Sequence, residues 1–234
     1  MHRALVAILL LCGVVVASHK KKPSESWAEL REKNLQLGFS VERIDCTLEA
    51  CRKSKLSVQE AEALLCPVYA AQEEALSAEC VLLKIEEGLV KRIAWKDVQT
   101  AAKERLERLR RADEMVLAAR QGRGGQHRHL VMHVCMAMES GLPEDVLVKL
   151  LGRPGGYRYG RMIHVVEAGE TLHLAGLDSG DVLHVMNDCL DRDLSGAEIA
   201  RVVDLVQIGL RAGKAFDAIH DSLWIPASAV CNDR

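Results

Sequence analysis

An internal duplication constrains the fold of this chain more than any other feature of its sequence. Residues 38–65 align without a gap with residues 176–203, at an offset of 138 residues, so that Gly38 falls on Gly176. The matches concentrate at positions suited to helix cores and helix caps. Such duplication is typical of helical-repeat proteins, in which each unit buries its apolar face against the next one.

Both copies contain the sequence Ser-x-x-Glu, at Ser57 to Glu60 and at Ser195 to Glu198. This spacing is that of a capping box, in which the serine hydroxyl accepts from the N3 amide and the glutamate reaches back to the N-cap amide. Each copy therefore predicts a helix, a short turn and a second, capped helix.

Apolar residues recur at helical spacing along most of the chain, and no convincing alternation of apolar and polar residues indicates a strand. With 49% hydrophobic but only 3% aromatic residues, the core must consist mainly of Leu, Val, Ala and Ile. We therefore predict an all-α fold of tandem helical hairpins, stacked as a short α-solenoid-like or irregular helical-repeat array. Helices are expected near residues 25–36, 41–53, 58–66, 68–92, 95–120, 128–140, 144–151, 159–174, 179–190, 196–211 and 214–223.

The duplication and the glycine clusters predict two helical halves, with a glycine-rich linker between them. The expected organisation is a signal peptide or anchor at 1–18, a basic linker at 19–24, an N-terminal half at 25–120, the linker at 121–127, a C-terminal half at 128–225 and a tail at 226–234.

The N-terminus has the pattern of an export signal. Arg3 precedes an apolar run at residues 4–17, and small residues suited to cleavage follow. This run is short for a membrane span. However, Lys20 to Lys22 follow at once, as at the flank of an uncleaved anchor. We therefore predict a protein exported to a periplasmic, extracellular or lumenal space, with membrane tethering through residues 4–17 as the alternative.

Removing the signal would leave seven of the eight cysteines, an odd number that implies at least one unpaired thiol or an intermolecular bridge. Cys46 and Cys51 lie five residues apart on one predicted helix and point to different sides of it. Cys66 and Cys80 flank a predicted helix turn. They are the more plausible disulfide pair. For most of the cysteines, however, the simpler interpretation is that they are small buried residues of the core.

The sequence from Asp191 to Gly196, with Asp193 and Ser195 between them, matches the first six positions of a calcium-binding loop. Position twelve of such a loop needs a bidentate carboxylate, and this chain has Val202 there. The other copy keeps the capping serine and glutamate but not the aspartates. Helix capping is therefore the favoured role, with a weak calcium site at Asp191 and Asp193 as the alternative.

A histidine cluster offers a second hypothetical metal site. His129 and His133 are spaced to share one helix face, and His127 could approach from the preceding linker, with Cys135 close by. Three converging nitrogens would suit zinc, whereas exposed or partly buried helix histidines would need no metal. No spacing predicts a shared site for the remaining histidines at His164, His173, His184 and His220.

A glycine-rich loop that alternates arginine and tyrosine precedes the helix expected from residue 159. It follows neither a P-loop nor a Rossmann pattern, so a nucleotide-binding fold is not supported. Tyrosine and arginine are enriched in binding hot spots, which makes this loop the sequence's first choice of contact surface. Its residues are Arg153, Tyr157, Arg158, Tyr159 and Arg161.

Nothing in the sequence specifies an enzyme, because no nucleophile elbow and no local Cys-His arrangement is present. A net charge of −2 gives no reason to expect a nucleic-acid partner. We therefore predict a non-catalytic binding or scaffold module that recognises another protein or an envelope component. The alternatives are a metal-dependent enzyme that uses the histidine cluster and a membrane-tethered structural protein of the cell envelope.

Overall fold

The computed structural model describes residues 23–120, 125–154 and 158–224, and within these ranges it contains eleven α-helices and no strand. The prediction of an all-α fold is therefore confirmed. The helices are α1 Trp27–Gln36, α2 Val41–Lys53, α3 Val58–Glu73, α4 Ala78–Val90, α5 Trp95–Arg120, α6 His127–Glu139, α7 Glu144–Leu151, α8 Tyr159–Leu174, α9 Ser179–Asp191, α10 Gly196–Arg211 and α11 Phe216–Leu223.

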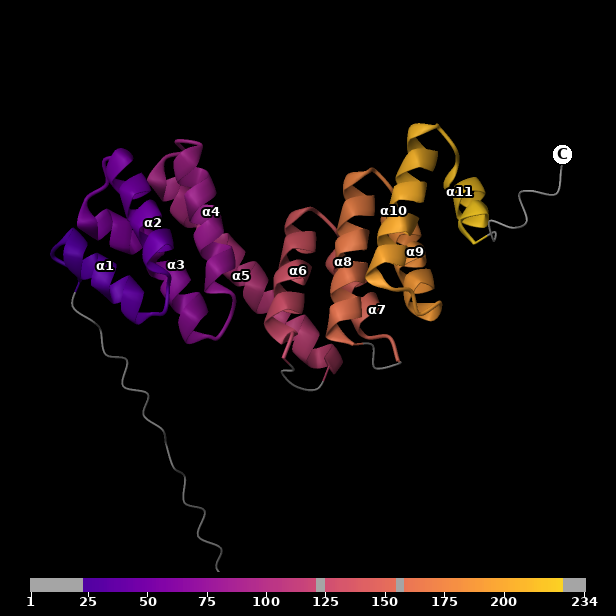
Figure 1. Cartoon of the computed structure of the whole chain (residues 1–234), viewed down its shortest axis with the longest axis horizontal. Helices are drawn as coiled ribbons and strands as arrows, with labels where there is room; N and C mark the ends of the chain where they lie inside the picture. Colours follow the sequence, from indigo (N-terminus) through magenta and orange to yellow (C-terminus); the bar gives the residue numbers. More distant parts are fainter. Residues whose placement is uncertain (1–22, 121–124, 155–157, 225–234) are drawn as a thin grey trace, which may run out of the picture.

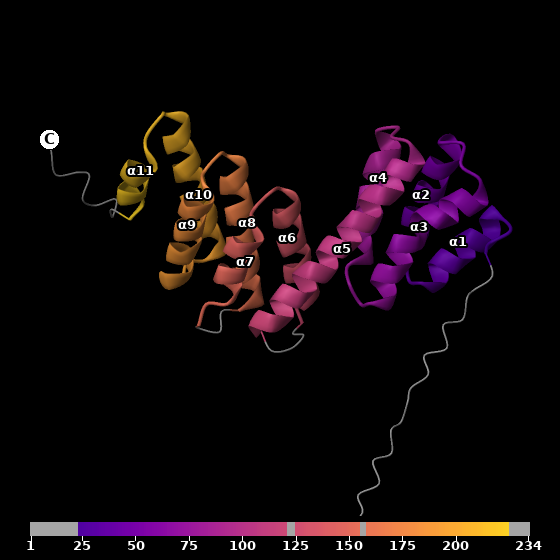
Figure 2. The same cartoon turned by 180° about the vertical axis from the view of Figure 1, so that it is seen from behind.

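The helices form hairpins that stack side by side into an elongated array (Figures 1 and 2). Alternate helices are neighbours: α1, α3, α5, α7 and α9 pack in succession, and so do α6, α8 and α10. The buried side chains between them are mostly Leu, Val, Ala and Ile. The structure is therefore a two-layered helical array with a continuous core, as expected for repeats that each cover the next one.

Helix α5 is the longest element and joins the two ends of the array. It runs obliquely through the middle of the molecule and packs on α3 and α4 at one end and on α6 and α7 at the other (Figure 1). Both predicted halves therefore share this helix, while most of the predicted linker between them, residues 121–124, lies outside the described residues.

The helix bounds repeat at the offset that the sequence suggested. A shift of 138 residues carries α2 onto α9 and α3 onto α10, at both ends of each helix. Both capping boxes are formed, with the Ser57 and Ser195 hydroxyls accepting from the amides of Glu60 and Glu198. Local sequence and backbone geometry therefore agree in the two copies.

Most turns between the helices are of one type. A residue with left-handed backbone follows the helix end, and the next amide donates to the carbonyl five residues back, which is the Schellman motif. The motif leaves helix-end carbonyls satisfied and reverses the chain sharply. The left-handed residues of these turns are Lys55, Ala75, Arg92, Gly141, Gly176, Asp193 and Gly213.

The residue whose carbonyl accepts the bond from the amide five residues later is usually small, which allows the next helix to approach closely. A Cβ added to Gly88 would lie 2.7 Å from Val98 Cγ2, and one added to Gly209 would lie 2.5 Å from Ile219 Cγ1. At these points the backbone of one helix therefore packs directly against a side chain of the next helix. The small residues at this position are Cys51, Ala71, Gly88, Ala137, Cys189 and Gly209.

Pro67 does not end a helix, which corrects the predicted break between residues 66 and 68. Helix α3 continues through Pro67 to Glu73, and the turn comes at Ala75 instead. Proline lacks the amide hydrogen that would bond to the carbonyl of Ala63. The side chain of Gln99 on α5 donates to that carbonyl at 2.6 Å, so a tertiary contact replaces the missing helical bond.

No helix among the described residues is both long and apolar enough to cross a bilayer. The predicted signal or anchor at residues 1–18 lies outside the described residues, so export stays a prediction.

Candidate functional site

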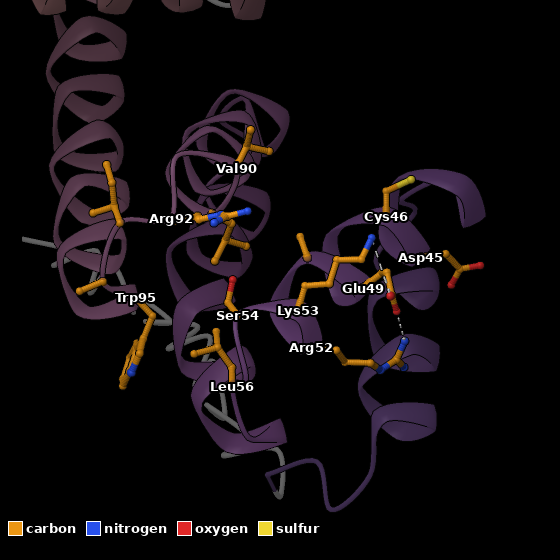
Figure 3. Close-up of a pocket in the computed structure, with 14 residues that line it drawn as sticks. Asp45, Cys46, Glu49, Arg52, Lys53, Ser54, Leu56, Val90, Arg92 and Trp95 are labelled. Carbon is orange, nitrogen blue, oxygen red and sulfur yellow. Dashed lines mark hydrogen bonds and ion pairs between the residues drawn. The ribbon is translucent and has the colours of Figure 1, made fainter.

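A groove of about 1250 Å³ opens between the C-terminal half of α2 and the turn that joins α4 to α5 (Figure 3). Helix α2 contributes Cys46, Glu49 and Lys53 to one wall. The other wall includes Val90 at the end of α4 and Trp95 at the start of α5. Because three helices line it, the stacking of hairpins creates this groove, and no local sequence motif could reveal it.

The charged groups of the α2 wall are held in place by neighbouring arginines. Arg31 donates from Nε to Asp45 Oδ1 at 2.6 Å and from Nη2 to Oδ2 at 3.1 Å, and this hydrogen bonding lowers the pKa of Asp45. Arg52 lies 3.5 Å from Glu49 and stacks its guanidinium 4.8 Å from the centre of the Trp27 ring. This wall therefore presents fixed charges of both signs.

An apolar strip continues from the groove along α4 and into the turn that follows it. Leu83, Val90 and Ile93 are 51%, 78% and 46% exposed, although they are large hydrophobic residues. A second hollow of about 450 Å³ shares Cys46 and Val90 with the groove and is lined by Leu83. The two hollows form one surface, which we call the α2–α4 groove. Exposed apolar residues gathered in this way mark binding surfaces more often than isolated ones do.

A polar clamp fixes the separation of α2 and α4 beneath this strip. Arg43 on α2 donates to both carboxylate oxygens of Glu86 on α4, at 3.0 and 2.7 Å, and to Glu79 at 3.0 Å. Thr47 also donates to Glu86, at 2.8 Å. Bidentate arginine pairs define geometry well, so the floor of the groove is preformed.

The chemistry of the α2–α4 groove suits binding. Cys46 is its one thiol among the described residues, and no histidine lines either hollow there. A thiol nucleophile needs a base or a cationic partner to become reactive. The combination of an apolar strip, a tryptophan and fixed charges is instead that of a recognition surface.

A buried cysteine pair lies where α4, α5 and α6 meet. Cys80 and Cys135 are hydrogen-bonded to each other, and Arg105 donates to Cys80 Sγ at 3.1 Å. The bond from Cys135 lowers the pKa of Cys80 to about 6, aided by the charge of Arg105, while the same bond and burial raise the pKa of Cys135. Glu139 bonds to Arg105 and lies 2.7 Å from Lys84 Nζ. Arg105 and the two thiols thus tie three helices together.

The structure gives the two cysteines suggested as a disulfide different surroundings. Cys66 is an exposed free thiol on α3 that donates to the carbonyl of Glu62 at 3.4 Å, and Cys80 is the buried partner of Cys135. The sequence missed that partner because 55 residues and the whole of α5 separate the two thiols.

The three histidines suggested as zinc ligands do not gather around one point. His127 Nε2 lies 2.5 Å from Asp113 Oδ1 and is buried, whereas His133 Nδ1 lies 3.3 Å from Glu167 Oε1. Among the described residues, the set of three side chains spaced for one metal ion lies elsewhere and does not include His129. His127 therefore joins α5 to α6.

The aspartates of the calcium-like loop point to separate arginines. Asp191 Oδ1 accepts from Arg153 at 2.5 Å, and Asp193 accepts from Arg161. Asp193 also adopts the left-handed turn conformation, with φ of 57°. Each carboxylate is thus neutralised by its own guanidinium, an arrangement that links the arginine-rich loop to the α9–α10 turn.

The remaining residues of the arginine and tyrosine loop are partly engaged in the fold. Tyr159 begins α8, packs against the core and lies edge-on to His127, with ring centres 6.2 Å apart. Arg158 is the exposed N-cap residue of α8, and Tyr157 lies outside the described residues. Part of the predicted contact loop therefore also forms the start of α8.

Comparisons of the chain with protein-family models, with curated proteins and with solved structures found no match. Function is therefore inferred from the geometry of the sites alone.

Proposed function

We propose that this chain is an exported, non-catalytic scaffold that binds a segment of another polypeptide in the α2–α4 groove. The observation that carries the proposal is the exposed apolar strip of Leu83, Val90 and Ile93 beside a preformed hollow. Burying such side chains contributes roughly 25 cal/mol per Å² of apolar surface. Export rests on the apolar run at residues 4–17 and the small residues after it.

The groove fits an amphipathic helical segment best. Its apolar strip follows α4 beside α2, and helix-in-groove recognition uses apolar anchors at helical spacing. Charges of both signs, Glu49 and Lys53 among them, line the groove. A partner segment with apolar anchors and flanking charged residues would match both features.

The test uses the full mature chain as bait for displayed random peptides. Selected peptides are then measured against a variant with Leu83→Glu and Val90→Glu, which places two charges on the strip without touching the core. The matched control carries Leu174→Glu and Ile208→Glu, at residues 66% and 58% exposed in the other half.

We expect peptides with apolar residues at helical spacing to lose at least about tenfold in affinity, or roughly 1.4 kcal/mol, for the groove variant. Their affinity for the control should match that of the unmodified chain. Equal binding to both variants, or a selection that enriches no peptide, would contradict the proposal. Circular dichroism must show the same helicity for all three proteins.

A further inference from the structure

At the opposite end of the array, two helices bring three metal-binding side chains together. His184 and Asp188 lie on α9 and His220 lies on α11, and among the described residues this is the group whose ligand atoms all lie within 4.8 Å of one another. His220 Nε2 is 2.7 Å from Asp188 Oδ2, and His184 Nε2 is 4.0 Å from the same oxygen. The two imidazole rings are 4.4 Å apart, centre to centre.

The fold itself positions these ligands. His184 and Asp188 are four residues apart, so they occupy one face of α9. Helix α11 reaches that face because Gly209 lets Ile219 pack directly against α10, which fixes the neighbouring His220. The site therefore depends on the same close helix approach that organises the rest of the array.

The spacing of the ligand atoms suits a small transition-metal ion. Metal–nitrogen and metal–oxygen bonds of about 2.0–2.2 Å place tetrahedral ligands roughly 3.3 Å from one another. The distances of 2.7 and 4.0 Å bracket this value, so small rotations of the side chains would close the site. His184 is more than half exposed, which leaves a path for the ion and for water.

Neighbouring charges favour a cation at this end of the molecule. Burial raises the pKa of Asp181, and so do a hydrogen bond with Asp178 and the nearby negative charges of Asp178 and Asp217. The Arg192 guanidinium stacks on the Trp224 ring, 4.1 Å from its centre. The indole nitrogen of Trp224 lies 3.4 Å from His220 Nε2.

The fold does not require this set of residues. At the duplicated positions of the N-terminal copy, His184 corresponds to Cys46 and Asp188 to Ala50. The first copy forms the same helices with the same bounds without them. The two α9 ligands are therefore specific to the second copy.

We propose that His184, Asp188 and His220 bind one divalent transition-metal ion of the zinc class, with water completing the coordination. Two imidazole nitrogens and one carboxylate oxygen form a donor set that zinc accepts readily, and three protein ligands leave a coordination position open. This site is independent of the α2–α4 groove.

The experiment titrates zinc into the metal-free full chain by calorimetry and repeats the titration with cobalt to record its absorption spectrum. The variants are His184→Ala, Asp188→Asn and His220→Ala. The matched control is His129→Ala with His133→Ala, which removes two histidines of α6 that lie outside the proposed site. Asp188→Asn keeps the size of its side chain and His184 is exposed, so these two variants separate loss of binding from loss of folding.

We expect one zinc ion per chain, a loss of at least about tenfold in affinity for each ligand variant, and no loss for the control. The cobalt spectrum should show ligand-field bands without the charge-transfer band of a thiolate ligand. Unchanged affinity in His184→Ala or Asp188→Asn, a thiolate band, or no binding at all would each overturn the site. Binding of peptides in the groove is a separate measurement, so either proposal can fail alone.

Discussion

The contact between Gly88 and Val98 offers the most direct test of how the helices pack. A Cβ on Gly88 would lie 2.7 Å from Cγ2 and 2.8 Å from Cγ1 of Val98, closer than side-chain carbons approach one another. Val98 is 2% exposed and β-branched, so it cannot rotate away easily. The same pair of helices carries one wall of the groove, at Val90 and Trp95.

Two opposing effects determine how Gly88→Ala changes the free energy of unfolding. Alanine gains roughly 1 kcal/mol over glycine in a helix interior, whereas an extra methyl in a packed core costs about 1–3 kcal/mol. We expect a net loss of roughly 0–2 kcal/mol in the unmodified chain. In a Val98→Ala background the two conflicting methyls are gone, so Gly88→Ala should stabilise the protein by about 1 kcal/mol.

The quantity to measure is the difference between the effects of Gly88→Ala on the free energy of unfolding in the two backgrounds. Urea unfolding of the four proteins, followed by circular dichroism, should give a coupling of about 1–3 kcal/mol. Gly160→Ala serves as a control, since a Cβ there would meet only the far end of the flexible Gln126 side chain. If the Gly88 and Val98 effects add within about 0.5 kcal/mol, α4 and α5 do not approach as closely as the structure indicates.

Two further predictions concern a turn and the cysteine pair. Ala75 has a left-handed φ of 58°, so Ala75→Gly should raise the free energy of unfolding by about 1 kcal/mol. The control Ala200→Gly, within α10, should lower it by about 1 kcal/mol. Urea unfolding measures both changes, and changes of the same sign would refute the turn assignment. The pKa of Cys80 is about 6 in the fold against an ordinary 9.0, so its thiolate should stabilise the protein increasingly as pH rises from 6 towards 9 and lose that contribution as pH falls through 6. Ultraviolet thiolate absorbance should show this titration and should lose it in Cys80→Ala, while Arg105→Met should move it to higher pH; a titration unaffected by either change would disprove the thiolate.

Local backbone structure was largely predictable from the sequence because its causes lie within a few residues. The capping boxes at Ser57 and Ser195 form as expected, and Gly176 supplies the left-handed turn that glycine permits. Pro67 shows the limit of such inference. Its effect depends on Gln99, a residue on another helix whose contact no local pattern reveals.

The sites were less predictable, because they depend on which helices the array brings together. His184 and His220 are 36 residues apart and meet only because α11 folds back against α9 and α10. The sequence predicted a metal site at His127 to His133 because these histidines lie on one helix. In the structure, however, His127 and His133 bond to carboxylates on different helices. Spacing along one helix predicts a shared face, whereas a site needs ligands that converge from several elements.

The duplication links the two proposed sites to one position in the repeat. The outer face of α2 carries Cys46 and Ala50, which line the groove against α4, and the matching face of α9 carries His184 and Asp188, which face α11. Cys46 and His184 are both exposed, and Ala50 and Asp188 are both half-buried, so burial at these two positions is the same in the two copies. One helix pair has therefore acquired an apolar strip and the other a set of metal ligands, while the buried residues that define the hairpin stayed alike. In an array of this kind the buried and turn positions determine the architecture, and the exposed positions between paired helices are free to determine what each copy binds.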